Sequence, residues 1–138
     1  MNKNKIILLD PGHGGLIRGE YVTAPSKMHK HDNGLTIFEG VWNRAISEKL
    51  KFALKTAGVE VVDVVNSQED VPLKTRVETA NRYAKAFGAS NALYVSIHAN
   101  AGGGKGFEVY TSKGETASDP VADKYMEFMA EAFPDRVA

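Results

Sequence analysis

The apolar run Ile6–Leu9, followed at once by the glycine-rich segment Asp10–Gly15, places the strongest constraint on the fold. Four consecutive aliphatic residues bounded by a turn signal are typical of a strand that is buried on both faces, as in parallel sheets. The glycines around His13 permit a tight turn and a close approach of the backbone. The pattern therefore predicts that a central strand ends by presenting one imidazole at the carboxyl edge of an open α/β sheet, where ligands of such sheets bind.

The rest of the chain alternates strands with helices. The expected helices are Ile37–Ala57, Leu73–Phe87 and Asp119–Phe133, and the expected strands are Lys5–Leu9, Val59–Val65, Ala92–Ile97 and Phe107–Tyr110. The segment Leu16–Leu35 has no sustained period, so we expect a functional loop there. Strands separated by helices indicate an α/β fold. We expect a single domain over residues 1–138, with a mostly parallel twisted sheet flanked by helices.

Composition excludes several classes of function. Lys plus Arg and Asp plus Glu both number 17, so no overall electrostatic field favours nucleic acid or an acidic membrane surface. The sequence has no cysteine, so any metal must be held by nitrogen and oxygen. The apolar run near the N-terminus is too short for a signal peptide, and no run reaches transmembrane length. We therefore expect synthesis in the cytoplasm, without a signal peptide and without membrane insertion.

Two histidines and one carboxylate are candidates for a metal site. His98 repeats the setting of His13, because it follows the apolar run Leu93–Ile97 and precedes a glycine cluster. Glu39 lies at the start of the first long helix, between the two histidines in the sequence. Two imidazoles and a carboxylate form a common catalytic zinc set, which leaves a fourth position open for water. An acidic residue is also favoured at a helix N-terminus for electrostatic reasons alone, so Glu39 has a structural explanation as well.

The other two histidines, His29 and His31, invite a rival metal interpretation. They lie in the polar, lysine-bearing segment Lys27–Asp32. Nothing in the pattern indicates a rigid element that would orient the two rings, as a metal site requires. We therefore expect this segment to be solvated and to line a substrate groove rather than to hold a metal.

Four blocks of the sequence together resemble the zinc-dependent N-acetylmuramoyl-L-alanine amidases of the type 3 family. They are Asp10–Gly15, Phe38–Arg44, Val71–Arg76 with Ala80 and Asn81, and Ser96–Asn100. The blocks occur in the order of the family and cover essentially the whole chain. The segments Tyr21–Thr23 and Gly34–Glu39 resemble phage or prophage endolysins more than cell-separation amidases.

The resemblance implies zinc held by His13, Glu39 and His98. It also implies that the metal-activated water attacks the lactyl carbonyl of N-acetylmuramic acid, which breaks its amide bond to L-alanine in bacterial peptidoglycan. Peptidoglycan and muropeptides are then the partners, and the cell wall is the place of action, reached after phage-type release. We expect Asp10 and Asn100 to orient the two histidines by contacting them outside the set of metal ligands. Arg76 is expected to pair with an acidic neighbour.

The sequence departs from the family pattern in one respect. Members of the family carry a second glutamate near the C-terminus, which acts as general base, and no residue here matches its motif. The nearest carboxylates, Glu108 and Glu115, lie in a different context. We expect this general base beyond Ala138, and therefore a C-terminally truncated domain. Loss of a general base lowers the rate by about 10²- to 10⁴-fold.

Two other functions stay open on this sequence. The first is a non-catalytic wall-binding or regulatory module on the same fold. In such a module the absence of the general base would be part of its function and not an accident. The second is a different zinc hydrolase, such as a carboxypeptidase that acts on stem peptides, since ligand sets of this kind recur across folds.

Overall fold

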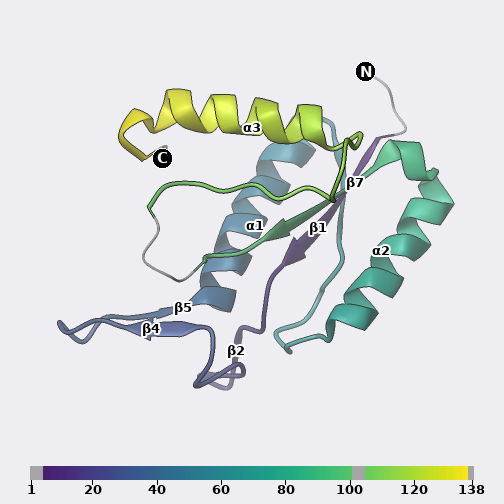
Figure 1. The fold of residues 1–138 in the computed structure, drawn as a ribbon. Helices are drawn as coiled ribbons and strands as arrows, with labels where there is room; N and C mark the ends of the chain where they lie inside the picture. The colour runs from purple at the N-terminus through teal and green to yellow at the C-terminus, as the bar shows by residue number, and fades with distance from the viewer. Residues whose placement is uncertain (1–4, 101–104, 137–138) are drawn as a thin grey trace. The chain divides into compact units, whose positions relative to one another are not determined.

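A three-stranded parallel sheet is the framework of the structure. The computed structural model describes residues 5–100 and 105–136, which divide into two compact units, 1–99 and 100–138. In the first unit the strand order is β6-β1-β7, where β1 is Ile6–Pro11, β6 is Glu60–Asp63 and β7 is Ala92–Ile97 (Figure 1). In this register Ile6 lies opposite Glu60 on one side and Ala92 on the other.

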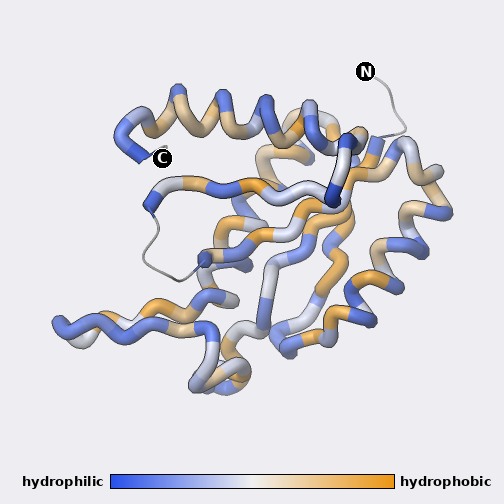
Figure 2. The backbone as a smooth tube through the Cα atoms, in the orientation of Figure 1, coloured by the Kyte–Doolittle hydropathy of each residue, from blue (hydrophilic) through white to orange (hydrophobic). Residues whose placement is uncertain are grey.

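The two helices α1 (Glu39–Thr56) and α2 (Leu73–Phe87) cover opposite faces of this sheet (Figure 1). Successive side chains of a strand point to opposite faces. Ile6 and Leu8 of β1 accordingly share one core cluster with Ala80 of α2. The central strands are the most hydrophobic part of the unit (Figure 2). The predicted α/β fold with a parallel sheet flanked by helices is confirmed.

Two small hairpins connect β1 to α1, where we expected a loop without regular structure. The first pairs β2 (Leu16–Ile17) with β3 (Glu20–Tyr21), and the second pairs β4 (Met28–Lys30) with β5 (Thr36–Phe38). The turn of the first hairpin has positive φ at Arg18 (51°) and Gly19 (85°), which suits the right-handed twist of a two-residue hairpin. Strands of two or three residues are too short to leave a readable period, so the expectation was wrong.

The second unit contains the helix α3 (Asp119–Ala132) and the 3₁₀ turn η2 (Pro134–Arg136). The strand that we expected at Phe107–Tyr110 is not formed in the part of this unit that the structure describes. A strand needs a ladder partner, whereas Phe107 contacts the ring of Phe133, with 5.4 Å between centroids. Within residues 5–100 and 105–136, no helix combines the length and the apolar character needed to cross a bilayer.

Candidate metal centre

His13 stands just beyond the end of β1, in a backbone conformation that side chains rarely adopt. Its φ is 64°, in the left-handed region, which costs free energy for a residue other than glycine. Two guanidinium groups hold this turn in place, because the His13 carbonyl accepts hydrogen bonds from Arg44 Nη1 (2.8 Å) and Arg76 Nη2 (3.2 Å). The surrounding structure therefore fixes the backbone from which the imidazole projects.

Glu39 is the first residue of α1, and its position is set by the start of that helix. Its backbone N–H donates to the Lys27 carbonyl (3.0 Å). The buried Tyr21 hydroxyl donates to the same carbonyl (2.9 Å) and accepts from the Gly40 N–H (3.0 Å). These bonds satisfy backbone donors that a helix N-terminus leaves without intrahelical partners. They also tie the glutamate to the second hairpin.

His98 follows β7, and its ring lies directly against Gly12. A Cβ atom on Gly12 would fall 2.2–2.6 Å from three atoms of that ring. Only a residue without a side chain can therefore occupy position 12 while His98 keeps this place. The Gly12 N–H also donates to the Ile97 carbonyl (2.9 Å), which continues the pairing of β1 with β7 up to the site.

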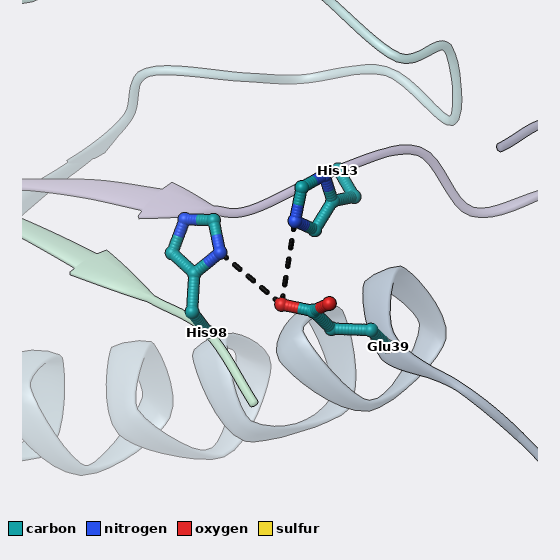
Figure 3. A group of neighbouring side chains, drawn as sticks. All are labelled: His13, Glu39 and His98. Carbon is teal, nitrogen blue, oxygen red and sulfur yellow. Dashed lines mark hydrogen bonds and ion pairs between the residues drawn. The ribbon is translucent and has the colours of Figure 1, made fainter. Parts of the chain in front are cut away.

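The structure brings His13, Glu39 and His98 together, as the sequence predicts (Figure 3). Glu39 Oε1 lies 3.3 Å from His13 Nε2 and 3.2 Å from His98 Nδ1. The potential ligand atoms of the three residues all lie within 4.8 Å of one another. Tetrahedral zinc with bonds of about 2.0–2.1 Å separates its ligand atoms by about 3.3 Å. The two distances from Glu39 Oε1 match this separation, so the group has the donor set and the spacing that a zinc ion needs.

The surroundings of the three side chains also suit a metal. Glu39 Oε1 accepts a hydrogen bond from the Ala99 N–H (3.2 Å), which helps to fix the carboxylate. Burial lowers the pKa of His13, although the Glu39 charge acts in the opposite direction. A lowered pKa keeps the imidazole neutral, which is the form that binds metal. The His98 side chain is 42% exposed, against 19% for His13 and 13% for Glu39, so the group is accessible from the His98 side.

Asp10 supports this turn through other residues rather than by contact with an imidazole. Its buried carboxylate accepts hydrogen bonds from Arg76 Nη1 and from the Tyr94 hydroxyl. Arg76 in turn donates to the carbonyls of Pro11 (2.9 Å) and His13. The prediction that Arg76 pairs with an acidic neighbour is confirmed. Burial and the Asp10 bond raise the pKa of Tyr94, so the phenol stays protonated and serves as a donor.

Sequence reasoning missed several residues that hold the site. Asn43 of α1 is completely buried and donates from Nδ2 to the Gly12 carbonyl (3.1 Å). Arg44 and Tyr21 hold the backbone at His13 and Glu39. Asn43 and Arg44 are adjacent polar residues of α1 within the block Phe38–Arg44, and that position is the signal that could have revealed them. Tyr21 lies in the segment Tyr21–Thr23 that resembles endolysins, but that resemblance gives no indication of its hydrogen bonds at the start of α1.

Asn100 and Glu108 lie in the second unit and contact each other. Glu108 Oε2 accepts hydrogen bonds from Asn100 Nδ2 (2.9 Å) and from the Tyr110 hydroxyl (2.5 Å). These donors, Tyr110 first, lower the pKa of Glu108. A carboxylate that already holds two donors is a poor proton acceptor. Glu115 is exposed in the loop that precedes α3.

Comparison with known proteins gives consistent results. The family model described as N-acetylmuramoyl-L-alanine amidase matches residues 7–136. The sporulation-specific N-acetylmuramoyl-L-alanine amidase of Bacillus subtilis (strain 168) is 31% identical over 110 residues, which cover 75% of this chain and 34% of that protein. The chain therefore spans about a third of the length of this relative.

Two solved structures are similar in fold. The catalytic domain of CwlV, an N-acetylmuramoyl-L-alanine amidase from Bacillus (Paenibacillus) polymyxa var. colistinus, matches with a TM-score of 0.58 at 24% identity, over 93% of this chain and 64% of its own. The amidase AmiC2 of Nostoc punctiforme matches with a TM-score of 0.47 at 28% identity, over 70% of this chain and 44% of its own.

Proposed function

The chain belongs to the N-acetylmuramoyl-L-alanine amidase family, and from this premise we propose that it hydrolyses the amide bond between N-acetylmuramic acid and L-alanine in peptidoglycan, with zinc as its cofactor. The observation that carries the proposal is the convergence of His13, Glu39 and His98 within the matched residues. These three side chains would hold the metal. Residues 1–138 would form the amidase domain.

When bound, zinc supplies a Lewis acid for the scissile carbonyl and lowers the pKa of water to near 7. The protein supplies the position of the ligands. Arg44 and Arg76 fix the turn that carries His13, and Tyr21 fixes the helix start that carries Glu39. Asp10 acts as a positioning residue behind His13, through Arg76. Ligands held in place before substrate arrives avoid reorganisation during the reaction.

A glutamate outside these 138 residues is the proposed general base. Glu108, with its lowered pKa and two donors, lacks the character of a base poised near neutral pH, and Glu115 is exposed in a loop. The turnover rate of the isolated chain should therefore be about 10²- to 10⁴-fold lower than that of a domain that has its general base. The assay consequently needs enzyme at a concentration similar to that of the substrate.

The proposal is tested by mass spectrometry of muropeptides incubated with the zinc-loaded chain. An amidase frees the amino group of L-alanine and leaves the sugar intact. Glu39→Gln should abolish both the product and zinc binding, whereas Glu48→Gln, an exposed change on the same helix, should alter neither. Release of terminal amino acids alone would identify a carboxypeptidase instead. Binding of muropeptide without any product, from a zinc-loaded protein in which the segment with the proposed general base is restored, would favour a wall-binding module.

The proposed place of action is the bacterial cell wall, in phage or prophage lysis. The segments Tyr21–Thr23 and Gly34–Glu39, which prompted this interpretation, include the end of β3, the strand β5 and the proposed metal ligand Glu39. The relative from Bacillus subtilis is named for sporulation. Expression of the coding sequence during induced lysis, compared with expression during sporulation or vegetative growth, separates these settings.

A further inference from the structure

The hairpin β4–β5 gives His29 and His31 the rigid support that the sequence did not reveal. His29 lies opposite Ile37 in the register, and the backbone N–H of His31 donates to the Leu35 carbonyl (2.8 Å). On the other side of His29, the Glu39 N–H donates to the Lys27 carbonyl (3.0 Å). Backbone hydrogen bonds therefore bracket the histidine pair. The earlier reason for setting this pair aside, that nothing orients the rings, does not hold in the structure.

The two imidazoles lie next to each other on one face of the hairpin. His29 lies in β4, and His31 follows the last residue of that strand. The ring centroids of His29 and His31 are 4.4 Å apart, with an interplanar angle of 82°. Both residues are exposed. In the part of the chain that the structure describes, neither ring takes part in a hydrogen bond or an ion pair, so their nitrogen atoms are available to a ligand from solution.

We propose that His29 and His31 form a second metal site, which chelates Cu²⁺ or Ni²⁺ through two imidazole nitrogens. Imidazole is a good ligand for these ions, and affinity for nitrogen ligands rises along the series to Cu²⁺. The second imidazole binds within the same molecule, so the pair holds the ion far more tightly than one histidine does. Water completes the coordination, because the residues opposite the pair, Ile37 and Leu35, carry no ligand atoms.

This site is chemically distinct from the centre formed by His13, Glu39 and His98. The main centre offers one carboxylate and two imidazole nitrogens, a donor set that is common at zinc sites. The hairpin pair offers two nitrogens and no carboxylate and is open to solvent, so it should bind Cu²⁺ more tightly than Zn²⁺. The two sites share no residue and are therefore separable by mutation. The second site does not depend on the proposed amidase activity.

The test is a calorimetric titration of untagged, folded protein with CuCl₂ and with NiCl₂ in a buffer that does not bind metals. The background is His98→Ala, which removes one ligand of the main centre. This background protein should still bind one metal ion, at the hairpin. Adding His29→Ala or His31→Ala should weaken that binding by on the order of 100-fold, because either change leaves one imidazole in place of two. Lys30→Ala, between the two histidines but on the other face, should leave the affinity unchanged.

Paramagnetic broadening provides a second measurement on the same protein. Substoichiometric Cu²⁺ should first broaden the ring proton signals of His29 and His31 in the NMR spectrum. Equal affinities of His98→Ala with and without the His29→Ala and His31→Ala changes would overturn the proposal. Broadening that begins at other residues would also overturn it. Because both histidines are exposed, these variants should keep the far-UV circular dichroism of the parent.

Discussion

Arg76 and Asp10, which lie 66 positions apart in the chain, form a buried ion pair directly beneath the turn that carries His13. The pair is almost completely buried, with side-chain exposures of 6% and 3%. The same guanidinium donates to the His13 carbonyl (3.2 Å). Helix α2 therefore supports the metal centre through the side chain of Arg76.

Arg76→Met should lower the free energy of unfolding by about 3–5 kcal/mol, because it leaves the Asp10 carboxylate buried without its cation. Urea denaturation of the protein measures this change. Lys74→Met is the matched control on the same helix, since its side chain is 87% exposed, and it should change stability by less than about 0.5 kcal/mol. If both variants lost the same free energy of unfolding, the buried Arg76–Asp10 pair would contribute no more to stability than an exposed lysine.

Gly12→Ala should weaken zinc binding by roughly 10- to 100-fold, because the new methyl group must displace the His98 ring. Competition with a colorimetric chelator measures the affinity. Gly19→Ala is the control, since φ there is +85° and no atom lies within 4 Å of the new Cβ. This second change strains only the backbone, at about 1–2 kcal/mol, and should leave zinc affinity intact. Unchanged zinc affinity in Gly12→Ala would contradict the placement of His98.

Tyr21→Phe should destabilise the protein by about 1–3 kcal/mol, because the Gly40 N–H loses a buried acceptor and the Lys27 carbonyl loses a donor. Thermal unfolding reports the loss. Hydrogen exchange of the first turn of α1 should accelerate at the same time. Tyr110→Phe removes an exposed hydroxyl in the other unit and serves as control. If exchange in α1 did not respond, the hydroxyl would have no part in fixing the helix start.

Zinc should raise the melting temperature of the chain, and a chelator should reverse the effect. A ligand that binds only the folded state at 100 times its Kd adds about 2.7 kcal/mol of stability. His98→Ala should lose both the bound zinc and this response, whereas His29→Ala should keep them. Elemental analysis of the purified proteins gives the stoichiometry, expected near one zinc per chain. A zinc response that survives in His98→Ala would place the metal elsewhere.

The sequence predicted those features that leave a long or repeated pattern. The strands β1 and β7 and the helices α1 and α2 each extend over six or more residues, so their periods are readable. His13 and His98 were found because each follows an apolar run that forms a strand, and parallel strands bring their carboxyl ends to one edge. The expectation that both strands are buried holds for β1 but is wrong for β7, whose residues are all half-buried or exposed. The hairpins were missed because their strands have only two or three residues.

Contacts between distant residues explain what was missed at the site itself. Asp10 was expected to orient the histidines because it is adjacent to them, but its partners are Arg76 and Tyr94, from α2 and β7. Pairing of this kind depends on the three-dimensional position of buried groups, which no local pattern encodes. The same holds for His29 and His31, whose orientation comes from a strand on the other side of the hairpin turn.

The position of β1 at the centre of the sheet has a consequence for biosynthesis. This strand leaves the ribosome first, yet Ile6 pairs with Ala92, which is made much later. At about 5–20 residues per second, the nascent chain must keep its most apolar segment from aggregating for several seconds. The last partner strand also delivers His98. A polypeptide released early, or stalled before this point, therefore has no complete metal centre.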